Sequence, residues 1–492
     1  MRTILHSLIA TAAMAVLAAP QEPAGAPGPA AQQSMKGVVR KRLAPVSNEV
    51  LHVKLPRPVE KKLKNGLPVL VIEKHKVPTV TLDLVLPAST LKDPAELPGV
   101  AEFTAEMMRL GTKTRSAKEI AETLTELGAS LYLNAQYGTR TTHLYATALS
   151  ENLDPLLDLM ADVLLNPTFP QDELDKLKQR TLSRLQMMRS QEFFLGGERL
   201  HDVLYPDDAR KISATTPDAV KKITRENLIS FWKEHYRPGN SLLGVAGDVK
   251  PPALFDKLET RLARWESGTA VEPKLPLAAP IAEKKIYLIN RPNSVQTFLL
   301  LANRAIDRMS PDYIPVQVMN RILGGGPTGR LFINLREEKG YTYGAYSSFA
   351  ALKYLHHFQA SSSVRTEVTE AAMREFLNEF RSIREKQVPK EEFEDAKRAI
   401  VASFALGLEQ PASMLRQILL LREYGLPADY WDTYPTKVMA VTQADVQRVA
   451  QKYIPLDNVQ VIAVGDAAKI RDVLAKFGPV EEYTAEGVRA KM

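Results

Sequence analysis

Hydrophobic residues along the chain occur in two patterns, short runs typical of strands and longer periodic stripes typical of helices. Runs rich in Val, Ile, Leu and Thr at Leu67–Glu73 and Thr79–Leu86 predict two strands, and Asn65-Gly66 just before them is a strong hairpin signal. Further strand-like runs lie at Ala129–Asn134 and Thr141–Thr147. These runs predict a sheet built from the early part of the chain.

Helical stripes lie between and after these runs. Two helices are expected with the following positions on their buried faces: Val100, Phe103, Met107 and Leu110 in the first, and Ile120, Leu124 and Leu127, before Gly128, in the second. A third helix is expected at Leu153–Leu165, with an N-cap at Ser150. This mixture of strands and long amphipathic helices favours an α+β fold.

The chain also contains an internal repeat. Ile223–Asp248 aligns without gaps with Val441–Asp466, so that Thr224 falls on Thr442 at an offset of 218 residues (442 − 224). Upstream, the segment from Pro170 matches that from Pro389 at an offset of 219 (389 − 170). Two matches at nearly one offset indicate a duplicated domain.

We therefore expect two homologous α+β domains at residues 50–265 and 284–485, joined by a linker at 266–283. Each domain is expected to hold a mostly antiparallel sheet with packed helices, and the pair to close like a clam-shell around a cleft, where substrate sites tend to form.

The N-terminus has the layout of a secretory signal. MRTILHSLIATAAMAVLAAP has Arg2 before an apolar run and small residues after it, and the Pro/Ala/Gly-rich segment that follows completes a signal peptide and flexible leader over residues 1–34. No later apolar stretch reaches the roughly 18–20 residues that span a bilayer, so no transmembrane anchor is expected in the mature chain. The absence of cysteine excludes disulfides and thiol catalysis. A periplasmic location fits best.

The charge of the chain and the motifs that it lacks exclude several classes of function. The net charge of +7 comes from 64 basic and 57 acidic residues spread along the chain, which argues against nucleic-acid binding. No two of the eight histidines are spaced as a pair of helical metal ligands, and no G-x-S-x-G nucleophile motif occurs.

Two stretches of the second domain could carry chemistry. Gly324, Gly325 and Gly326 begin a near P-loop, but Arg330 and Leu331 stand where Lys and Ser/Thr would bind phosphate and magnesium, so nucleotide binding is rejected. Two interpretations of these glycines stay open: a flexible turn before a helix, and a turn whose exposed backbone contacts an extended peptide.

Downstream, Arg336 lies in the last turn of a helix that ends near Gly340, and Tyr343 enters a strand seven residues later. From the residues alone, the favoured interpretation is that Arg336 complements the helix dipole and Tyr343 fills the sheet.

The whole of residues 50–485 resembles the pitrilysin/insulinase-type zinc peptidase family, most closely its mitochondrial processing peptidase branch and small bacterial homologues. LKNGLPVLVIEKHKVPTV, PGVAEFTAEMMRLGT, LNPTFPQDELDKLKQ, YRPGNSLLGVAGD and ILGGGPTGRLFINLREEKGYTYGAYSSF carry this resemblance. Active members have His-x-x-Glu-His on the helix matching PGVAEFTAEMM. Here those positions hold Glu102, Ala105 and Glu106.

The third ligand of the family, a Glu on a later helix, falls near Ser183 and Arg184, and neither can replace it. The resemblance therefore implies a subunit that holds no metal and is inactive alone. Two carboxylates without further oxygen donors also make a poor calcium or magnesium site, so we expect Glu102 and Glu106 to be solvated or salt-bridged.

In active relatives an Arg and a Tyr seven residues apart reach the substrate at the zinc, and Arg336 and Tyr343 match them. The resemblance implies that Tyr343 donates a hydrogen bond to the oxyanion and that Arg336 binds a peptide carbonyl. We therefore expect the non-zinc subunit of a heteromeric periplasmic metallopeptidase, with Gly324–Gly326 handling substrate and a homologous partner supplying zinc. A non-enzymatic assembly or binding protein is the alternative. An independent hydrolase has no support.

Overall fold

The computed structural model describes residues 51–275 and 279–490, so the signal and leader expected at 1–34 lie outside the described residues. In the first half, the strands are β1 (Val59–Lys62), β2 (Pro68–Glu73), β3 (Thr79–Leu86), β4 (Ser130–Ala135), β5 (Thr142–Leu149) and β6 (Leu242–Gly247). The helices are α1 (Val100–Met108), α2 (Ala117–Glu126), α3 (Leu153–Leu165), α4 (Gln171–Met188), α5 (Glu192–Leu204), α6 (Pro217–Lys222), α7 (Arg225–His235) and α8 (Pro251–Arg261).

The second half repeats this order of elements. Its strands are β7 (Lys285–Asn290), β8 (Gln296–Arg304), β9 (Thr342–Ala351), β10 (His356–Arg365), β11 (Gln460–Gly465) and β12 (Val480–Tyr483). Its helices are α9 (Tyr313–Leu323), α10 (Arg330–Phe332), α11 (Thr369–Glu385), α12 (Lys390–Gly407), α13 (Pro411–Tyr424), α14 (Tyr430–Ala440), α15 (Gln443–Tyr453) and α16 (Ala467–Ala475). Short 3₁₀ segments occur at Thr90–Lys92, Ser150–Asn152, Ala209–Lys211 and Thr366–Val368.

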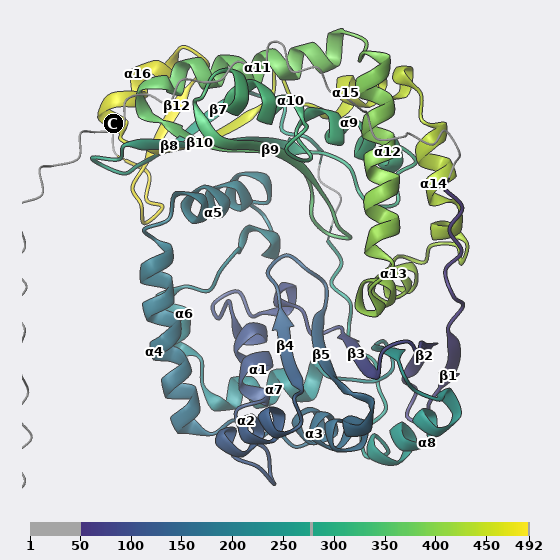
Figure 1. Cartoon of the computed structure of the whole chain (residues 1–492). Helices are drawn as coiled ribbons and strands as arrows, with labels where there is room; N and C mark the ends of the chain where they lie inside the picture. The colour runs from purple at the N-terminus through teal and green to yellow at the C-terminus, as the bar shows by residue number, and fades with distance from the viewer. Residues whose placement is uncertain (1–50, 276–278, 491–492) are drawn as a thin grey trace, which may run out of the picture. The chain divides into compact units, whose positions relative to one another are not determined.

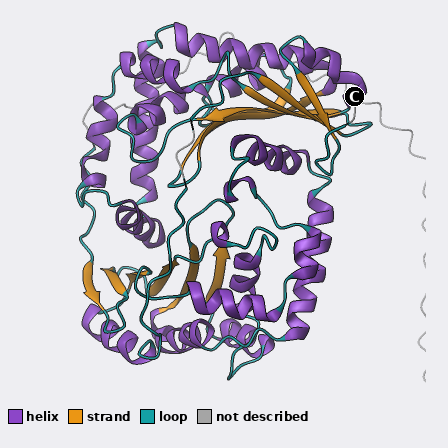
Figure 2. Cartoon of the chain, turned by 180° about the vertical axis from the view of Figure 1, so that it is seen from behind, coloured by secondary structure: helices purple, strands orange, loops and turns teal. Residues whose placement is uncertain are grey.

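The described strands form two six-stranded sheets, which appear as two separate groups of arrows in Figure 2 and match in five of their six strands, the edge strands β1 and β12 being the exception. The strand orders are β1-β2-β6-β3-β5-β4 and β12-β7-β11-β8-β10-β9. Pairing is antiparallel except for β2 with β6, β7 with β11 and β12 with β7. The duplicated α+β fold expected from the sequence is confirmed, and β4 and β9 are equivalent edge strands of the two sheets.

Each sheet is covered on one face by a helix from the other half of the chain. Helix α5 packs on β8 and β11 of the second sheet, and Figure 1 shows α5 beside that sheet. There Phe194, Leu195 and Leu200 join a cluster with Phe298 and Ile462. In return, α13 packs on β6 of the first sheet. Helices α5 and α13 begin 219 residues apart (411 − 192), which is the offset of the repeat. They are therefore equivalent helices, and each packs on the sheet of the opposite half.

Most local expectations are confirmed, with two differences. The turn at Asn65-Gly66 joins β1 to β2, and β6 lies between β2 and β3. The Ser150 cap is wrong: a 3₁₀ turn precedes α3, and the Ser150 hydroxyl donates to Asp248 Oδ2 at 2.9 Å. A side-chain oxygen that can reach a carboxylate from a neighbouring element is no longer available to the helix N-terminus, and this competition is invisible in the local sequence.

None of the helices in the described part of the chain is both long and apolar enough to cross a bilayer.

We predict that Gly247→Ala destabilises the chain far more than Gly465→Ala at the equivalent place in the repeat. Gly247 has φ +140°, and a Cβ there would lie 2.1 Å from the Thr79 carbonyl oxygen, which is backbone and cannot move aside. At Gly465 the nearest atom to such a Cβ is the end of the Ile470 side chain at 2.9 Å. We expect a loss of about 2–3 kcal/mol for Gly247→Ala and under about 1 kcal/mol for Gly465→Ala.

Denaturant unfolding of both variants beside the unmodified chain measures this difference. Equal losses in the two variants would contradict the argument from backbone contact.

Candidate functional site

A buried carboxylate sets the start of α1. Asp93 accepts hydrogen bonds from the backbone N–H groups of Gly99 at 2.6 Å and Ala101 at 2.8 Å, which satisfies two donors at the helix N-terminus. The pKa of Asp93 is raised from 3.8 to about 7, mainly by burial and to a smaller extent by the Glu102 charge, although these two hydrogen bonds act in the opposite direction. Asp93 therefore fixes the start of α1 with a carboxyl group whose pKa lies well above its ordinary value.

The sequence of α1 then orients its carboxylates. Val100, Phe103 and Met107 are buried in the core of the first half, as the periodicity predicts. Glu102 and Glu106 consequently lie on the opposite face, one turn apart, where they line a cavity of about 380 Å³. The cavity lies between α1, the edge strand β4 and α4.

Glu102 is held by two side chains from elsewhere in the fold. Arg184 of α4 donates to its Oε1 at 2.6 Å, and the Tyr137 hydroxyl donates to its Oε2 at 2.9 Å. Burial first, and then the negative charges of Glu102 and Asp93, raise the pKa of Tyr137, so its phenol keeps the proton that it donates.

Glu106 pairs within its own helix end. The Arg109 guanidinium lies 2.6 Å from Glu106 Oε1, three residues along the chain. Ala105, between the two carboxylates, is buried and carries no polar group. Arg180 of α4 also lines the cavity, so two guanidiniums face two carboxylates there.

These residues do not fit a zinc ion. The position that the family resemblance assigns to the third ligand falls near Ser183 and Arg184, and the Arg184 guanidinium contacts the first former ligand position, Glu102, directly. A dication placed beside Glu102 would meet that guanidinium at close range, and a carboxylate already engaged by Arg and Tyr would have to release both. The cavity is thus built as a charge-paired polar site.

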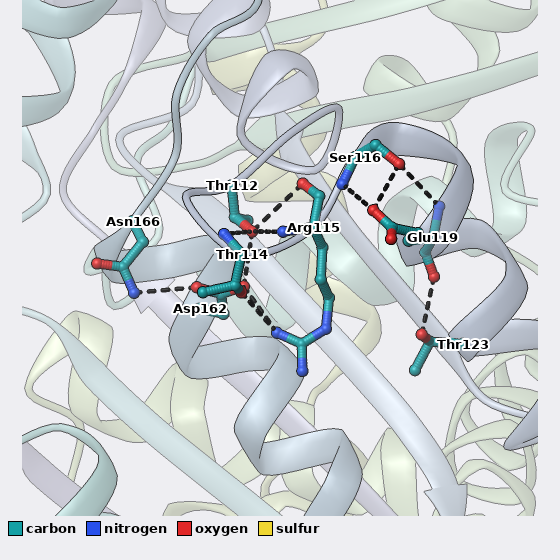
Figure 3. A network of polar contacts seen from close by, with 8 residues as sticks. All are labelled: Thr112, Thr114, Arg115, Ser116, Glu119, Thr123, Asp162 and Asn166. Carbon is teal, nitrogen blue, oxygen red and sulfur yellow. Dashed lines mark hydrogen bonds and ion pairs between the residues drawn. The ribbon is translucent and has the colours of Figure 1, made fainter.

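The loop after α1 is fixed by a second buried carboxylate, Asp162 of α3 (Figure 3). Its oxygens accept from Thr112, Thr114, Arg115 and Asn166 at 2.6–3.0 Å. Burial raises the pKa of Asp162, but these hydrogen bonds together hold it below 3.8. The same figure shows the capping box that starts α2, in which the Ser116 side chain accepts from the Glu119 backbone N–H and the Glu119 side chain accepts from the Ser116 backbone N–H. Both ends of the loop that follows the candidate site are therefore rigidly anchored.

Arg336 lies on a π-helical turn, Ile333–Glu338, that continues α10. Phe332 and Leu335 are buried, and Gly340 follows with φ +63°, as expected for a helix that ends there. The Arg336 guanidinium packs over the Phe332 ring at 4.7 Å and reaches Glu337 only at 3.5 Å, with 46% of the side chain exposed. Its polar edge is therefore largely available to solvent.

Tyr343 does not fill the sheet, so the packing role favoured from the residues alone is wrong. Its side chain is 90% exposed. The reason is a β-bulge, since Thr342 pairs with Val364 and Ala345 with Ser362, which leaves Tyr343 and Gly344 opposite the single residue Ser363. The Thr342 hydroxyl donates to the Ser363 carbonyl at 2.7 Å and stabilises this irregular pairing.

The glycine turn is closely packed. A Cβ on Gly324 would lie 2.7 Å from the Ser347 backbone nitrogen, and that nitrogen donates to the Gly324 carbonyl at 2.9 Å. The Gly325 carbonyl accepts from Arg321 at 3.1 Å, and the Gly326 carbonyl accepts from the Gly329 N–H at 2.9 Å. The turn is thus bonded to β9, the strand that carries Tyr343.

The structure brings the sequence-predicted residues together in two groups. Glu102, Glu106 and Arg184 surround the cavity at α1, and Arg336, Tyr343 and Gly324–Gly326 lie around β9. None of the second group is among the residues that line the α1 cavity.

Sequence reasoning missed Asp93 and Tyr137. Both are single polar residues in irregular segments, and no spacing rule connects them with α1. Only the folded chain places them against it.

Two family models match most of the described chain. Residues 68–218 match the model for "Insulinase (Peptidase family M16)", and residues 222–400 match that for the "Peptidase M16 inactive domain". A Rickettsia felis relative described as an uncharacterized zinc protease is 30% identical over 339 residues, which is 66% of this chain and 80% of that protein.

Other relatives agree with this match. A Helicobacter pylori protein described as the non-peptidase homolog YmxG is 23% identical, over 82% of this chain and 93% of its own. The crystal structure of a peptidase M16 inactive domain from Pseudomonas fluorescens superposes with a TM-score of 0.77 at 27% identity, covering 83% of this chain and 98% of that chain.

We predict that replacing Glu102 and Glu106 with histidine creates a strong zinc site at α1 only if Arg184 is replaced as well. The triple variant Glu102→His, Glu106→His, Arg184→Glu presents two imidazoles and a carboxylate, and we expect it to retain about one zinc per chain after dialysis. The double variant that keeps Arg184 should bind zinc at least about tenfold more weakly, because a guanidinium remains against the site.

Zinc titration against a chromophoric competitor measures both affinities. Equal affinity in the double and triple variants would show that Arg184 does not govern the site.

We predict a pH dependence of stability that arises from Asp93. Its folded pKa of about 7 lies above its unfolded value near 3.9, so between these values the folded chain holds a proton that the unfolded chain has lost. The free energy of unfolding therefore falls as pH rises through this window, by up to about 1.4 kcal/mol per pH unit, and levels off above it.

The measurement is denaturant unfolding from pH 4 to 9 for the unmodified chain and Asp93→Asn, whose difference should shrink as pH rises. Asp162→Asn is the control without a slope in this range, because the Asp162 pKa is lowered from 3.8 and its contribution is lost only as pH falls below about 4. A flat difference for Asp93→Asn across the window would refute the assignment.

Proposed function

Because this chain belongs to the insulinase family of peptidases, peptidase family M16, we propose that it is the non-zinc subunit of a heteromeric periplasmic zinc metallopeptidase. In this proposal a homologous partner holds the metal and the general base. This chain contributes substrate binding and transition-state stabilisation through Arg336 and Tyr343, and it does not hydrolyse peptides alone.

The observation that carries the proposal is the exposed phenol of Tyr343. A tyrosine that is 90% exposed on an edge strand contributes little to stability, and no hydrogen bond engages its hydroxyl within the described part of the chain. The bulge in β9 directs this side chain out of the sheet. A phenol in that position can donate to an oxyanion that forms on a substrate carried by a partner.

Arg336 supports the same role. Its stacking on Phe332 restricts the guanidinium without satisfying its donors, so the ordering cost of binding a peptide carbonyl is partly met in the free chain. As the edge strand of its sheet, β9 can pair with an extended peptide beside these two side chains. Further along this edge, at Ser347, the backbone groups are already bonded to Gly324 and Asn320.

One observation favours the alternative of a non-enzymatic assembly protein. Met187 and Phe193, at the connection between α4 and α5, are 63% and 61% exposed, and exposed large apolar side chains close together are typical of docking surfaces. A relative named as a non-peptidase homolog is in keeping with this alternative. Both functions require a partner, so they differ in whether Arg336 and Tyr343 affect a hydrolytic rate.

We predict that Tyr343→Phe lowers kcat of the assembled enzyme about 100–1000-fold with little change in KM, because the phenol acts on charge that develops in the transition state. The measurement is hydrolysis of an unstructured peptide by this chain purified together with a homologous subunit that carries an intact zinc motif. Tyr346→Phe, which removes the same hydroxyl from a half-exposed neighbour on β9, is the matched control and should stay within about threefold.

Peptide hydrolysis by this chain in isolation, or an unchanged rate for Tyr343→Phe in an active pair, would rule the proposal out. Assembly without any hydrolysis by the pair would favour the non-enzymatic alternative.

A further inference from the structure

A second cavity, of about 550 Å³, lies in the other half of the chain between α9, α12, α13 and α14. Its position follows from the repeat. Helix α9 follows β8 as α1 follows β3, and α12 begins 219 residues after α4 (390 − 171) and packs on α9. Two walls of this cavity, α9 and α12, are therefore the equivalents of α1 and α4, while α13 and α14 line it in place of the edge strand that lines the charge-paired cavity at α1.

The charges around this cavity are not balanced. Its lining residues include Arg308 and Arg321 but no Asp or Glu. Arg321 donates to the Gly325 carbonyl and the Thr328 hydroxyl, and no salt bridge of the described residues includes either arginine. Three carboxylates adjoin the wall in sequence. Asp312 accepts from Arg448, Lys452 and Tyr453 at 2.6–2.9 Å, Asp432 accepts from Arg57 at 2.6 Å, and Asp307 accepts from the Met309 backbone N–H at 2.6 Å. The residues that line the cavity therefore carry a net positive charge.

Arg308 is held in place by aromatic rings. Its guanidinium carbon lies 4.0 Å from the Tyr313 ring centre and 5.7 and 5.8 Å from those of Trp431 and Tyr430. Its Nε is buried and has no hydrogen-bond partner in the described structure. Stacked in this way, a guanidinium keeps its charge and the donors of its outer edge while losing little conformational freedom when an anion binds.

The remaining wall is aromatic and rigid. Phe404, Trp431 and Tyr434 contact one another with ring centres 5.0–5.4 Å apart. The Trp431 indole N–H donates to the Gln417 carbonyl at 2.8 Å, which fixes the plane of the ring. Such a wall is suited to a flat apolar group, and the volume lies in the range of small-molecule sites, roughly 300–1,000 Å³.

We propose that this cavity binds an aromatic carboxylate, with the carboxylate at Arg308 and the ring against Phe404 and Trp431. A carboxylate matches the planar guanidinium and would neutralise an unpaired charge, and an aromatic ring matches the stacked wall. Two sources share this chemistry: the free carboxyl end of a peptide whose last residue is aromatic, and a free aromatic acid. The site needs no zinc-bearing partner, so the proposal stands apart from the peptidase function.

Calorimetry on the full chain with N-acetyl-L-phenylalanine and with its carboxamide tests the proposal. We expect the acid to bind and the carboxamide to bind at least about tenfold more weakly, since the charge-assisted hydrogen bonds are lost. Ala-Ala-Ala-Phe with a free carboxylate separates the sources, because tighter binding of the tetrapeptide assigns the site to a peptide end and tighter binding of the acetylated residue assigns it to a free acid.

Two variants locate the binding. Arg308→Met keeps most of the side-chain volume and should weaken acid binding at least about tenfold, whereas Arg381→Met on α11, which removes the same charge outside the cavity, should not change it. Ser403→Trp fills the cavity from an exposed position on α12, so it tests the site even if Arg308→Met does not fold.

Equal affinity for the acid and the carboxamide, unchanged binding in Ser403→Trp, or no detectable binding of the acid would overturn the proposal.

Discussion

The arrangement of this molecule depends on the reciprocal packing of α5 and α13, each from one half of the chain, on the sheet of the other half. Both contacts are made at a glycine. A Cβ on Gly196 of α5 would lie 2.5 Å from the Phe298 ring, and one on Gly244 of β6 would lie 2.7 Å from Leu415 of α13. The removal of a side chain at each contact lets the helix approach the sheet closely, and the buried apolar area couples the halves.

This coupling also affects the candidate site at α1. Helix α4 supplies Arg184 to Glu102, and only a short connection separates it from α5, which is buried in the other half. The ion pair replaces the charge that a dication would bring, at a place where two carboxylates on one helix face would otherwise repel each other. Breaking such a pair leaves a partly buried carboxylate without a cation, so the site now favours its arginine over a metal.

The cavities beside the two equivalent helix pairs, α1 with α4 and α9 with α12, differ in their charge. At α1 the carboxylates and guanidiniums are matched and the surrounding residues are mostly satisfied. Between α9 and α12 the cationic groups have no acidic partner in the lining, and aromatic rings occupy the wall. A duplicated scaffold thus presents one neutralised site and one open to an anion, while β9 presents Tyr343 through a bulge.

The sequence by itself determined the duplication, the α+β class and the loss of the zinc motif, because these depend on local spacing: residues repeated at one offset, apolar positions at helical period, and a motif read along a single helix. The residues at the three motif positions, and the region near Ser183 and Arg184 where the third ligand falls, were found through the resemblance to the peptidase family. Tertiary structure alone decided the partners of those residues, because Tyr137, Asp93 and Arg184 reach α1 from separate segments. It also decided that Tyr343 is exposed, since the bulge depends on how Thr342 and Ser363 meet across two strands, and that Arg308 forms no salt bridge with a described residue, since Asp312 faces α15.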